Sequence, residues 1–297
     1  MFIDVHVHTR LWPGYPRPDG RTYARPEQLL ERFDALGIAQ AVVMAGVSPE
    51  CSRQVMSVEE VLEVCRLHPG RFIPFCNVDP RNLTNAPDAP LAEILRWHRD
   101  AGCKGVGEIT ANLPFDDPMV HNLFAGCQEV HLPVTFHMSP TLGGNYGLYD
   151  EPGLPGLERA LGKFPELVFL GHSQAFWAEI GPLDDPAQRG GYPAGAVPRP
   201  GRVVELMRRY PNLHGDLSAN SGCNAVSRDE EFGAAFLAEF QDRLHFGTDM
   251  TATDTPTPLV GCLQSLRDEG RIDAACFEKI ARRNTAELLG VDGGRSD

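Results

Sequence analysis

Phe2-Ile3-Asp4-Val5-His6-Val7-His8 is the first apolar run of the chain, and it ends in a pair of histidines. Alternate side chains of an extended strand share a face, so His6 and His8 point the same way with one valine between them. Strand stability does not require such a pair, whereas two neutral imidazoles on one face form half a site for a divalent metal ion. Two ordinary strand histidines are the alternative, and the ends of the other strands decide between the two interpretations.

Short β-type runs alternate eight times with amphipathic helical stretches along the sequence. Most of the runs are rich in Val, Ile, Leu and Phe and are bounded by Gly, Pro or Asn. The predicted strands are residues 2–8, 38–45, 71–77, 103–109, 132–137, 167–171, 212–218 and 243–249. The predicted helices are residues 26–36, 57–67, 88–101, 118–130, 154–163, 202–209, 229–241 and 257–269, with a helical tail at 273–289.

Eight strand–helix units in 297 residues predict an α/β fold, a (β/α)8 TIM barrel in which residues 1–297 form a single domain. A doubly wound open sheet is the alternative, but no G-x-G-x-x-G follows an early strand. The segments 9–25, 139–153 and 173–201, after strands 1, 5 and 6, are long and rich in Pro and Gly. Loops that follow barrel strands lie at the catalytic face, so these three are expected to wall a pocket.

The composition limits the class of protein and its partners. A hydrophobic content of 42% and a mean hydropathy of −0.24 are typical of a soluble globular enzyme. No uninterrupted apolar stretch is long enough to span a bilayer, and the chain begins without a secretory leader. The eight cysteines form no C-x-x-C pair, so reduced cysteines in a cytoplasmic protein are expected. The formal net charge of −13, with scattered Lys and Arg, argues against nucleic acid as a partner. A small-molecule substrate, no membrane and a possible homo-oligomer are the expectations.

Residues of the types that bind metals end five of the predicted strands. Strand 1 ends in His6-Val7-His8 and strand 4 in Gly107-Glu108-Ile109. Strands 5, 6 and 8 end in Phe136-His137-Met138, Gly171-His172-Ser173 and Gly247-Thr248-Asp249. Each such residue could instead cap a carbonyl or a helix, but six coincidences of that kind are improbable. The pattern therefore predicts a metal site at the rim where barrel enzymes do chemistry.

The order of an HxH pair, a strand-4 Glu, a strand-5 His, a strand-6 His and a strand-8 Asp resembles the amidohydrolase superfamily of metal-dependent (β/α)8 hydrolases, over essentially the whole chain. The Phe-His, Gly-His-Ser and Phe-Gly-Thr-Asp strand ends are most similar to the amidohydrolase-2 branch, which includes aminocarboxymuconate-semialdehyde decarboxylase and related lactonases and hydratases. Gly107-Glu108-Ile109 instead resembles the strand-4 glutamate of TatD-type and related binuclear members.

The resemblance implies that His6, His8 and Asp249 hold one metal ion, which His137 completes in mononuclear members. In binuclear members His137 and His172 hold a second ion, and Glu108 could bridge the two. Asp249 is the expected proton acceptor for a water bound to the ion. His172 either binds the second ion or polarises the substrate carbonyl. With nitrogen and oxygen ligands and no thiolate, zinc is the first expectation, with one or two ions per chain; manganese and iron stay open.

These residues predict a hydrolase that attacks a small-molecule amide, lactone or ester carbonyl with metal-bound hydroxide. The alternative enzyme class is a non-oxidative decarboxylase or hydratase on the same scaffold. A TatD-like nuclease is disfavoured by the net charge, and a metal-binding protein without catalysis is disfavoured by Asp249.

Other polar residues near the predicted rim have both a structural and a functional interpretation. Asp4 and His245 lie one layer below their strand ends, where a hydrogen-bonded structural role is favoured. An arginine near the metal would suit a carboxylate-bearing substrate, although loop packing is the favoured role for any single loop residue. The candidates for substrate contact are Arg10, Trp12, Tyr15, Arg17, Trp177, Glu179, Asn220, Asn224 and Arg228. The scarcity of basic residues around the mouth argues against a polyanionic substrate.

Overall fold

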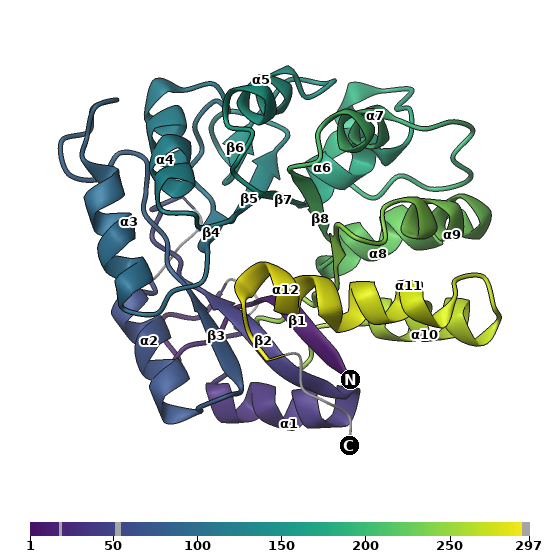
Figure 1. Cartoon of the computed structure of the whole chain (residues 1–297), viewed down its shortest axis with the longest axis horizontal. Coiled ribbons are helices and arrows are strands. Elements are labelled where there is room, and N and C mark those ends of the chain that lie inside the picture. Colours follow the sequence, from purple (N-terminus) through teal and green to yellow (C-terminus); the bar gives the residue numbers. More distant parts are fainter. Residues whose placement is uncertain (18–19, 51–54, 293–297) are drawn as a thin grey trace.

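Strands and helices alternate along the chain in the computed structural model, which describes residues 1–17, 20–50 and 55–292. The strands that correspond to the eight predicted ones are β1 (Phe2–Val7), β2 (Ile38–Met44), β3 (Phe72–Phe75), β4 (Val106–Ile109), β5 (Val134–Ser139), β7 (Phe169–His172), β8 (Leu213–Asp216) and β9 (Leu244–His245). The helices between and after them are α1 (Pro26–Leu36), α2 (Val58–Leu67), α3 (Leu91–Asp100), α4 (Pro118–Glu129), α5 (Pro155–Lys163), α7 (Arg202–Arg209), α9 (Glu230–Glu239) and α10 (Pro258–Asp268). Figure 1 shows these helices arranged around the strands.

The strands form a closed parallel barrel. Two parallel sheets, in the orders β1-β2-β3 and β4-β5-β7-β8-β9, are joined at both edges. Cys76 pairs with Val106 at one junction, where the Cys76 amide donates to the Gly105 carbonyl at 3.0 Å. Val7 pairs with Met250 at the other, where the Val5 amide donates to the Phe246 carbonyl at 2.9 Å. The predicted (β/α)8 barrel is confirmed.

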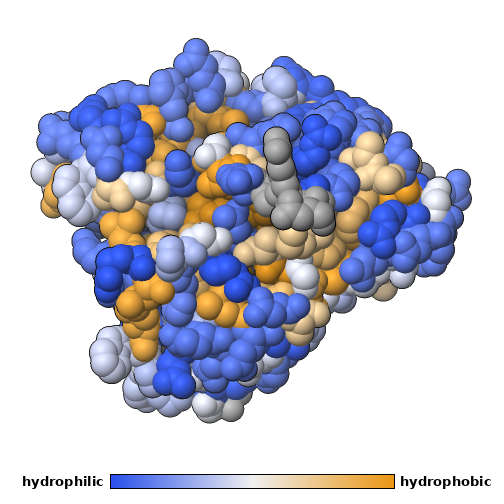
Figure 2. All heavy atoms as spheres, turned by 60° about the horizontal axis from the view of Figure 1, so that its bottom comes forward, coloured by the Kyte–Doolittle hydropathy of each residue, from blue (hydrophilic) through white to orange (hydrophobic). Residues whose placement is uncertain are grey.

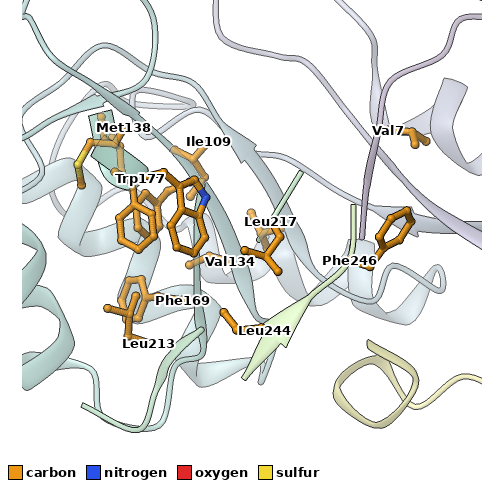
Figure 3. Close-up of a cluster of buried hydrophobic side chains, with 14 of the residues drawn as sticks. Val7, Ile109, Val134, Met138, Phe169, Trp177, Leu213, Leu217, Leu244 and Phe246 are labelled. Atoms are coloured by element: carbon orange, nitrogen blue, oxygen red, sulfur yellow. The ribbon is translucent and has the colours of Figure 1, made fainter. Parts of the chain in front are cut away.

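Apolar side chains fill both sides of the barrel wall. Figure 3 shows one cluster between strands and helices, in which Trp177 lies near Val134 and Phe169. A second cluster lines the barrel interior and includes Ile3, Val5, Val42, Met44, Ile73, Phe75 and Leu170. The helix α12 (Asn284–Leu289) packs against this interior cluster through Ala286 and Leu289. Burial of this kind contributes roughly 25 cal/mol per Å² of apolar surface, so α12 stabilises the barrel that holds the rim residues.

Local signals set several helix boundaries as predicted. Pro26 and Pro118 occupy the first turns of α1 and α4, where a missing N–H costs no intrahelical hydrogen bond. Gly37 ends α1 with φ of 72°, a left-handed conformation that favours glycine. Asp117 caps α4 by accepting a hydrogen bond from the Met119 amide at 2.8 Å.

The structure differs from the prediction mainly after β5, β7 and β8. The predicted loop 139–153 contains the short strand β6 (Leu148–Tyr149), and 173–201 contains α6 (Gln174–Trp177), η1 (Ala178–Ile180) and η2 (Pro186–Gly190). An unpredicted helix, α8 (Ala219–Ser227), follows β8; its Asn, Ser and Gly residues have low helix propensity. The predicted strand 243–249 is regular only at β9, and its remaining residues reach the rim in irregular backbone. The helical tail divides into α11 (Ala274–Glu278), the π-helical turn η3 (Lys279–Arg283) and α12.

The surface carries both hydrophilic and hydrophobic side chains. On the face in Figure 2, hydrophilic side chains predominate and hydrophobic ones show between them. Within the described ranges, no helix combines the length and apolar character needed to cross a bilayer. Seven cysteines are free in this part of the chain, and Cys51 lies outside the described residues.

Candidate metal centre

His6 and His8 bring their Nε2 atoms together at the end of β1. The two nitrogens lie 3.0 Å apart. The Nδ1 atom of His6 lies 2.6 Å from Oδ2 of Asp216. Because a carboxylate only accepts hydrogen bonds, Nδ1 of His6 carries the proton and its Nε2 is the free ligand atom when the ring is neutral.

Glu108 lies between two pairs of histidines and turns one oxygen to each. Its Oε2 is 3.7 Å from Nε2 of His6 and 3.5 Å from Nε2 of His8. Its Oε1 is 2.6 Å from Nδ1 of His137 and 3.6 Å from Nε2 of His172. Burial favours the neutral carboxyl, but the adjacent His137 and the hydrogen bonds of the other histidines hold the pKa of Glu108 well below its usual range. The carboxylate is therefore ionised and faces both pairs.

The register of two neighbouring strands places His137 beside His172. β5 and β7 are parallel, and the two histidines are paired across them. Their ring centroids are 5.5 Å apart. Gly147 allows the loop after β5 to pass close by, because a Cβ at that position would lie 2.7 Å from Cδ2 of His137. The neighbouring Tyr146 ring then packs on the His137 ring at 4.4 Å between centroids.

Asp249 reaches the strand-1 histidines from the other side of the barrel junction. Its amide donates to the His6 carbonyl at 2.8 Å. Its Oδ1 lies 3.7 Å from Nε2 of His6 and 3.6 Å from Nε2 of His8. The side chain is 28% exposed, in contrast to buried His6, so it faces the space above the site. All six residues predicted for the site, His6, His8, Glu108, His137, His172 and Asp249, are brought together; their metal-binding and catalytic roles stay predictions.

Asp216 is a site residue that the sequence interpretation missed. It ends β8, is completely buried, and lies 2.6 Å from Nδ1 of His6 and 3.3 Å from Nδ1 of His172. The two imidazoles outweigh burial and hold the pKa of its carboxyl below the usual range. Burial disfavours a charged His6, but Asp216 and Glu108 together raise the pKa of its imidazole. The signal in the sequence was a carboxylate within the predicted strand 212–218, which is a residue of the type that can bind a metal.

The donor set fits a divalent metal ion. Three groups of residues have ligand atoms within 4.8 Å of one another: His6, His8 and Glu108; His6, His172 and Asp216; and Glu108, His137 and His172. Two Nε2 lone pairs that face each other at 3.0 Å repel unless a proton or a cation lies between them. Nitrogen and oxygen donors without thiolate suit zinc, manganese or iron.

Asp4 and His245 are hydrogen-bonded structural residues, as expected. Asp4 accepts hydrogen bonds from the amides of His6 and Thr248, both at 3.0 Å, and from the Thr248 hydroxyl at 2.5 Å. Burial raises the pKa of Asp4 to about 7. His245 lies between Nδ1 of His214 and the hydroxyl of Thr285, each at 3.0 Å. Burial lowers the pKa of His245 to about 4.

A cavity of about 490 Å³ lies above the candidate metal centre. Its floor includes His8, Glu108, His137 and Asp249. The three long loops supply its walls, as predicted, through Arg10, Tyr15, Arg17, Arg21, Tyr23, Tyr146, Gln174 and Tyr192. Three arginines, Arg10, Arg17 and Arg21, line the cavity, and all three come from the loop after β1.

The candidates for substrate contact divide into two groups. Arg10, Tyr15, Arg17 and Asn220 line the cavity. The other five, Trp12, Trp177, Glu179, Asn224 and Arg228, are absent from the described lining. Trp177 is buried and its indole N–H donates to the Asp216 carbonyl at 2.9 Å, so it supports the site from the core. Glu179 is buried in an ion pair with Arg189 at 2.7 Å. Packing of the loops against the barrel buries Trp177 and Glu179, whereas Trp12 is exposed outside the described lining.

The family comparison agrees with this architecture. The family model Amidohydro_2, described as amidohydrolase, matches residues 3–291, so the chain belongs to this family. No curated protein gives a significant match.

Solved structures with low sequence identity share the fold. An uncharacterized TIM-barrel protein from Bordetella bronchiseptica is 20% identical, with a TM-score of 0.65 over 97% of this chain and 98% of that chain. An amidohydrolase from Burkholderia multivorans with bound zinc is 15% identical, with a TM-score of 0.63 over 98% and 100%. The 5-carboxyvanillate decarboxylase of Sphingomonas paucimobilis is 16% identical, with a TM-score of 0.62 over 98% and 99%. Among the similar structures are therefore both an amidohydrolase and a decarboxylase.

Proposed function

We propose that this protein is a metal-dependent hydrolase that acts on the amide, lactone or ester carbonyl of a small, carboxylate-bearing molecule. The observation that carries the proposal is the position of Asp249, whose Oδ1 lies 3.7 and 3.6 Å from the Nε2 atoms of His6 and His8. A carboxylate so close to the two strongest candidate ligands, yet exposed to the cavity, is placed to exchange protons at the same point.

These residues would hold a divalent ion, which would lower the pKa of a water molecule and polarise a carbonyl oxygen. Asp249 accepts the proton of the attacking water and returns it to the leaving group. Tyr146, which packs on His137 and lines the cavity, bounds the space that a substrate can fill. His172 is buried and does not line the described cavity, which favours a ligand role for it over direct contact with the carbonyl.

Two ions, with zinc as the first choice of metal, form part of the proposal. Glu108 turns Oε2 to His6 and His8 and Oε1 to His137 and His172, as a bridging carboxylate does. The short contact of 2.6 Å between Glu108 and His137 also fits a carboxylate that only orients the imidazole of a single-ion site. The zinc in the Burkholderia amidohydrolase supports the choice of metal.

The carboxylate of the substrate is proposed from the arginines of the loop after β1. Arg17 and Arg21 line the cavity, and the guanidinium of Arg17 lies 4.8 Å from the centroid of the Tyr23 ring. A planar guanidinium binds a carboxylate through two parallel hydrogen bonds. The expected partner is therefore a small organic acid in the cytoplasm, rather than a nucleic acid or a membrane, and the chain could act as a homo-oligomer.

Non-oxidative decarboxylation or hydration of a small carboxylated substrate is the second candidate. The decarboxylase among the similar structures favours it. In a decarboxylase the carboxylate of the substrate would itself react at the metal centre. The arginines of the loop after β1 would then not need to bind it.

The test is a substrate screen with metal-loaded protein. Lactones, N-acyl amino acids, cyclic amides and carboxylated aromatics are incubated with the protein, and products are identified by mass spectrometry. If a carbonyl compound is cleaved and the products together weigh 18 Da more than the substrate, the hydrolase is supported. Release of CO2 without such a gain would reject hydrolysis in favour of decarboxylation, and addition of water to a double bond would favour hydration.

A further inference from the structure

Asp216 lies between the rings of His6 and His172. Its Oδ2 lies 2.6 Å from Nδ1 of His6 and 3.3 Å from Nδ1 of His172, while its Oδ1 accepts a hydrogen bond from the Ser218 amide at 2.9 Å. The far nitrogens of the same two rings face Glu108, with Nε2 of His6 3.7 Å from Oε2 and Nε2 of His172 3.6 Å from Oε1. One oxygen of Asp216 thus contacts a ring from each half of the site, and the Ser218 hydroxyl, 3.0 Å from Nδ1 of His172, shares the contact with the second ring.

We propose that Asp216 is a positioning residue that holds His6 and His172 together, so that one carboxylate orients a ligand in each half of the metal centre and sets the tautomer of His6. The inference rests on the proposed metal centre and not on the reaction that it catalyses. A carboxylate accepts but does not donate, so contact with Nδ1 keeps the proton there and leaves Nε2 as the ligand atom.

The surroundings of Asp216 support this role over that of a plain helix cap. The residue is completely buried, and a buried carboxylate is costly unless it is fully paired. One backbone amide, that of Ser218, donates to its side chain, and the imidazoles supply the other contacts. The indole of Trp177 fixes its backbone carbonyl from the core. Asp216 is therefore held rigidly by the barrel and presents its second oxygen to the site.

An isosteric variant tests the proton arrangement. In Asp216→Asn, an amide oxygen that accepts from Ser218 leaves its NH2 group facing Nδ1 of His6 and His172. Nδ1 of His6 must then accept, and the ring proton moves to Nε2, the ligand atom, whereas Nδ1 of His172 keeps the Ser218 hydroxyl as a partner. The flipped amide would instead set its NH2 group against the Ser218 amide. The first arrangement reverses the hydrogen bond to His6, and the second loses the hydrogen bond from the Ser218 amide.

The matched control is Asp4→Asn. Asp4 is also completely buried, but it accepts from two backbone amides and one hydroxyl and contacts no imidazole nitrogen. An asparagine can keep these contacts, because its oxygen accepts from the amides and its NH2 group donates to the Thr248 hydroxyl. The control therefore reports the replacement of a completely buried carboxyl group that contacts no imidazole nitrogen.

Zinc affinity is measured by competition with a chelator for the full-length wild-type chain and both variants. Loss of a carboxylate that orients a metal-binding histidine typically costs about 10–100-fold in metal affinity. We expect a loss of this size in Asp216→Asn and a clearly smaller one in Asp4→Asn. Equal zinc affinity of Asp216→Asn and wild type, or an equal loss in both variants, would overturn the inference.

A second measurement does not depend on the variant. In zinc-loaded wild type carrying 15N-labelled histidine, Nδ1–H of His6 should give a slowly exchanging downfield NMR signal. Absence of this signal would overturn the inference, also if Asp216→Asn fails to fold, and would make Asp216 a direct ligand or a structural residue. Wild type that binds no zinc would reject the metal centre itself. Zinc binding without hydrolysis of any carbonyl substrate would reject only the proposed function.

Discussion

Replacement of Glu108 by alanine changes the number of ions that the site can hold. In the binuclear arrangement, His6, His8 and Asp249 serve one ion and His137 and His172 serve the other, with one oxygen of Glu108 for each. Without Glu108 the first ion keeps three protein ligands and the second keeps two. Three ligands are typical of catalytic zinc sites, whereas two hold zinc weakly. The zinc content of protein grown with excess zinc should therefore fall from nearly two ions per chain to nearly one.

The assay is elemental analysis after dialysis, with protein concentration determined independently. Glu50→Ala is the control for the loss of a glutamate as such, because Glu50 is ion-paired with Arg81, which keeps Asp79 as a second partner. The control should bind as much zinc as wild type. A wild-type content that stays at one ion under saturating zinc, and is the same in Glu108→Ala, would refute the bridge. Glu108 would then act as the acceptor that orients His137, with which it makes its shortest contact.

Four other outcomes follow from the same geometry. Asp249→Asn should lower the turnover of a substrate by ~10²–10⁴-fold while zinc stays bound, since the amide keeps a ligand oxygen but cannot accept a proton; near-normal turnover would show that another group is the base. Arg17→Leu should raise KM for a carboxylated substrate more than for its methyl ester, and equal changes in KM would remove Arg17 from substrate binding. A single-stranded or duplex oligonucleotide should be neither bound nor cleaved by the zinc-loaded protein, and cleavage at enzyme-like rates would favour a nuclease. Burial lowers the pKa of His245 to about 4, so the unfolded chain takes up this proton first as pH falls. His245 by itself should therefore remove about 3 kcal/mol of the stability of metal-free protein between pH 6.5 and 4. The free energy of unfolding in urea should depend less on pH in His245→Asn than in wild type or the exposed-site control His131→Asn, and parallel curves would contradict the assignment.

The fold could be predicted because its signals are local. Each barrel strand is a short apolar run bounded by turn residues, and prolines and glycines mark the helix ends near Pro26, Gly37 and Pro118. The elements that were missed depend on tertiary contacts. β6 exists because Leu148 pairs with Met138 of β5, which no local pattern encodes. α8 forms after β8 although its residues have low helix propensity.

The candidate site was predictable to the extent that its residues end strands. His137 and His172 could be placed together because parallel strands carry equivalent ends to one rim. Asp216 was missed because an aspartate at a strand end can either cap a helix or contact a metal-binding histidine. Its distance to His6 in the structure distinguishes the two roles. Trp177 was misplaced since an aromatic residue in a long loop carries no signal of whether it turns to the cavity or to the core.

The junction between β1 and the segment after β9 also determines when the metal centre can form during synthesis. Asp249 reaches His6 and His8 through the backbone hydrogen bonds that close the barrel, and it is synthesised about 240 residues after His8. At ~5–20 residues per second, a ribosome needs roughly 10–50 s for that interval. Almost the whole chain must therefore be synthesised before His6 and His8 can contact Asp249. We expect the cell to supply the ion to a finished barrel and not to a nascent one.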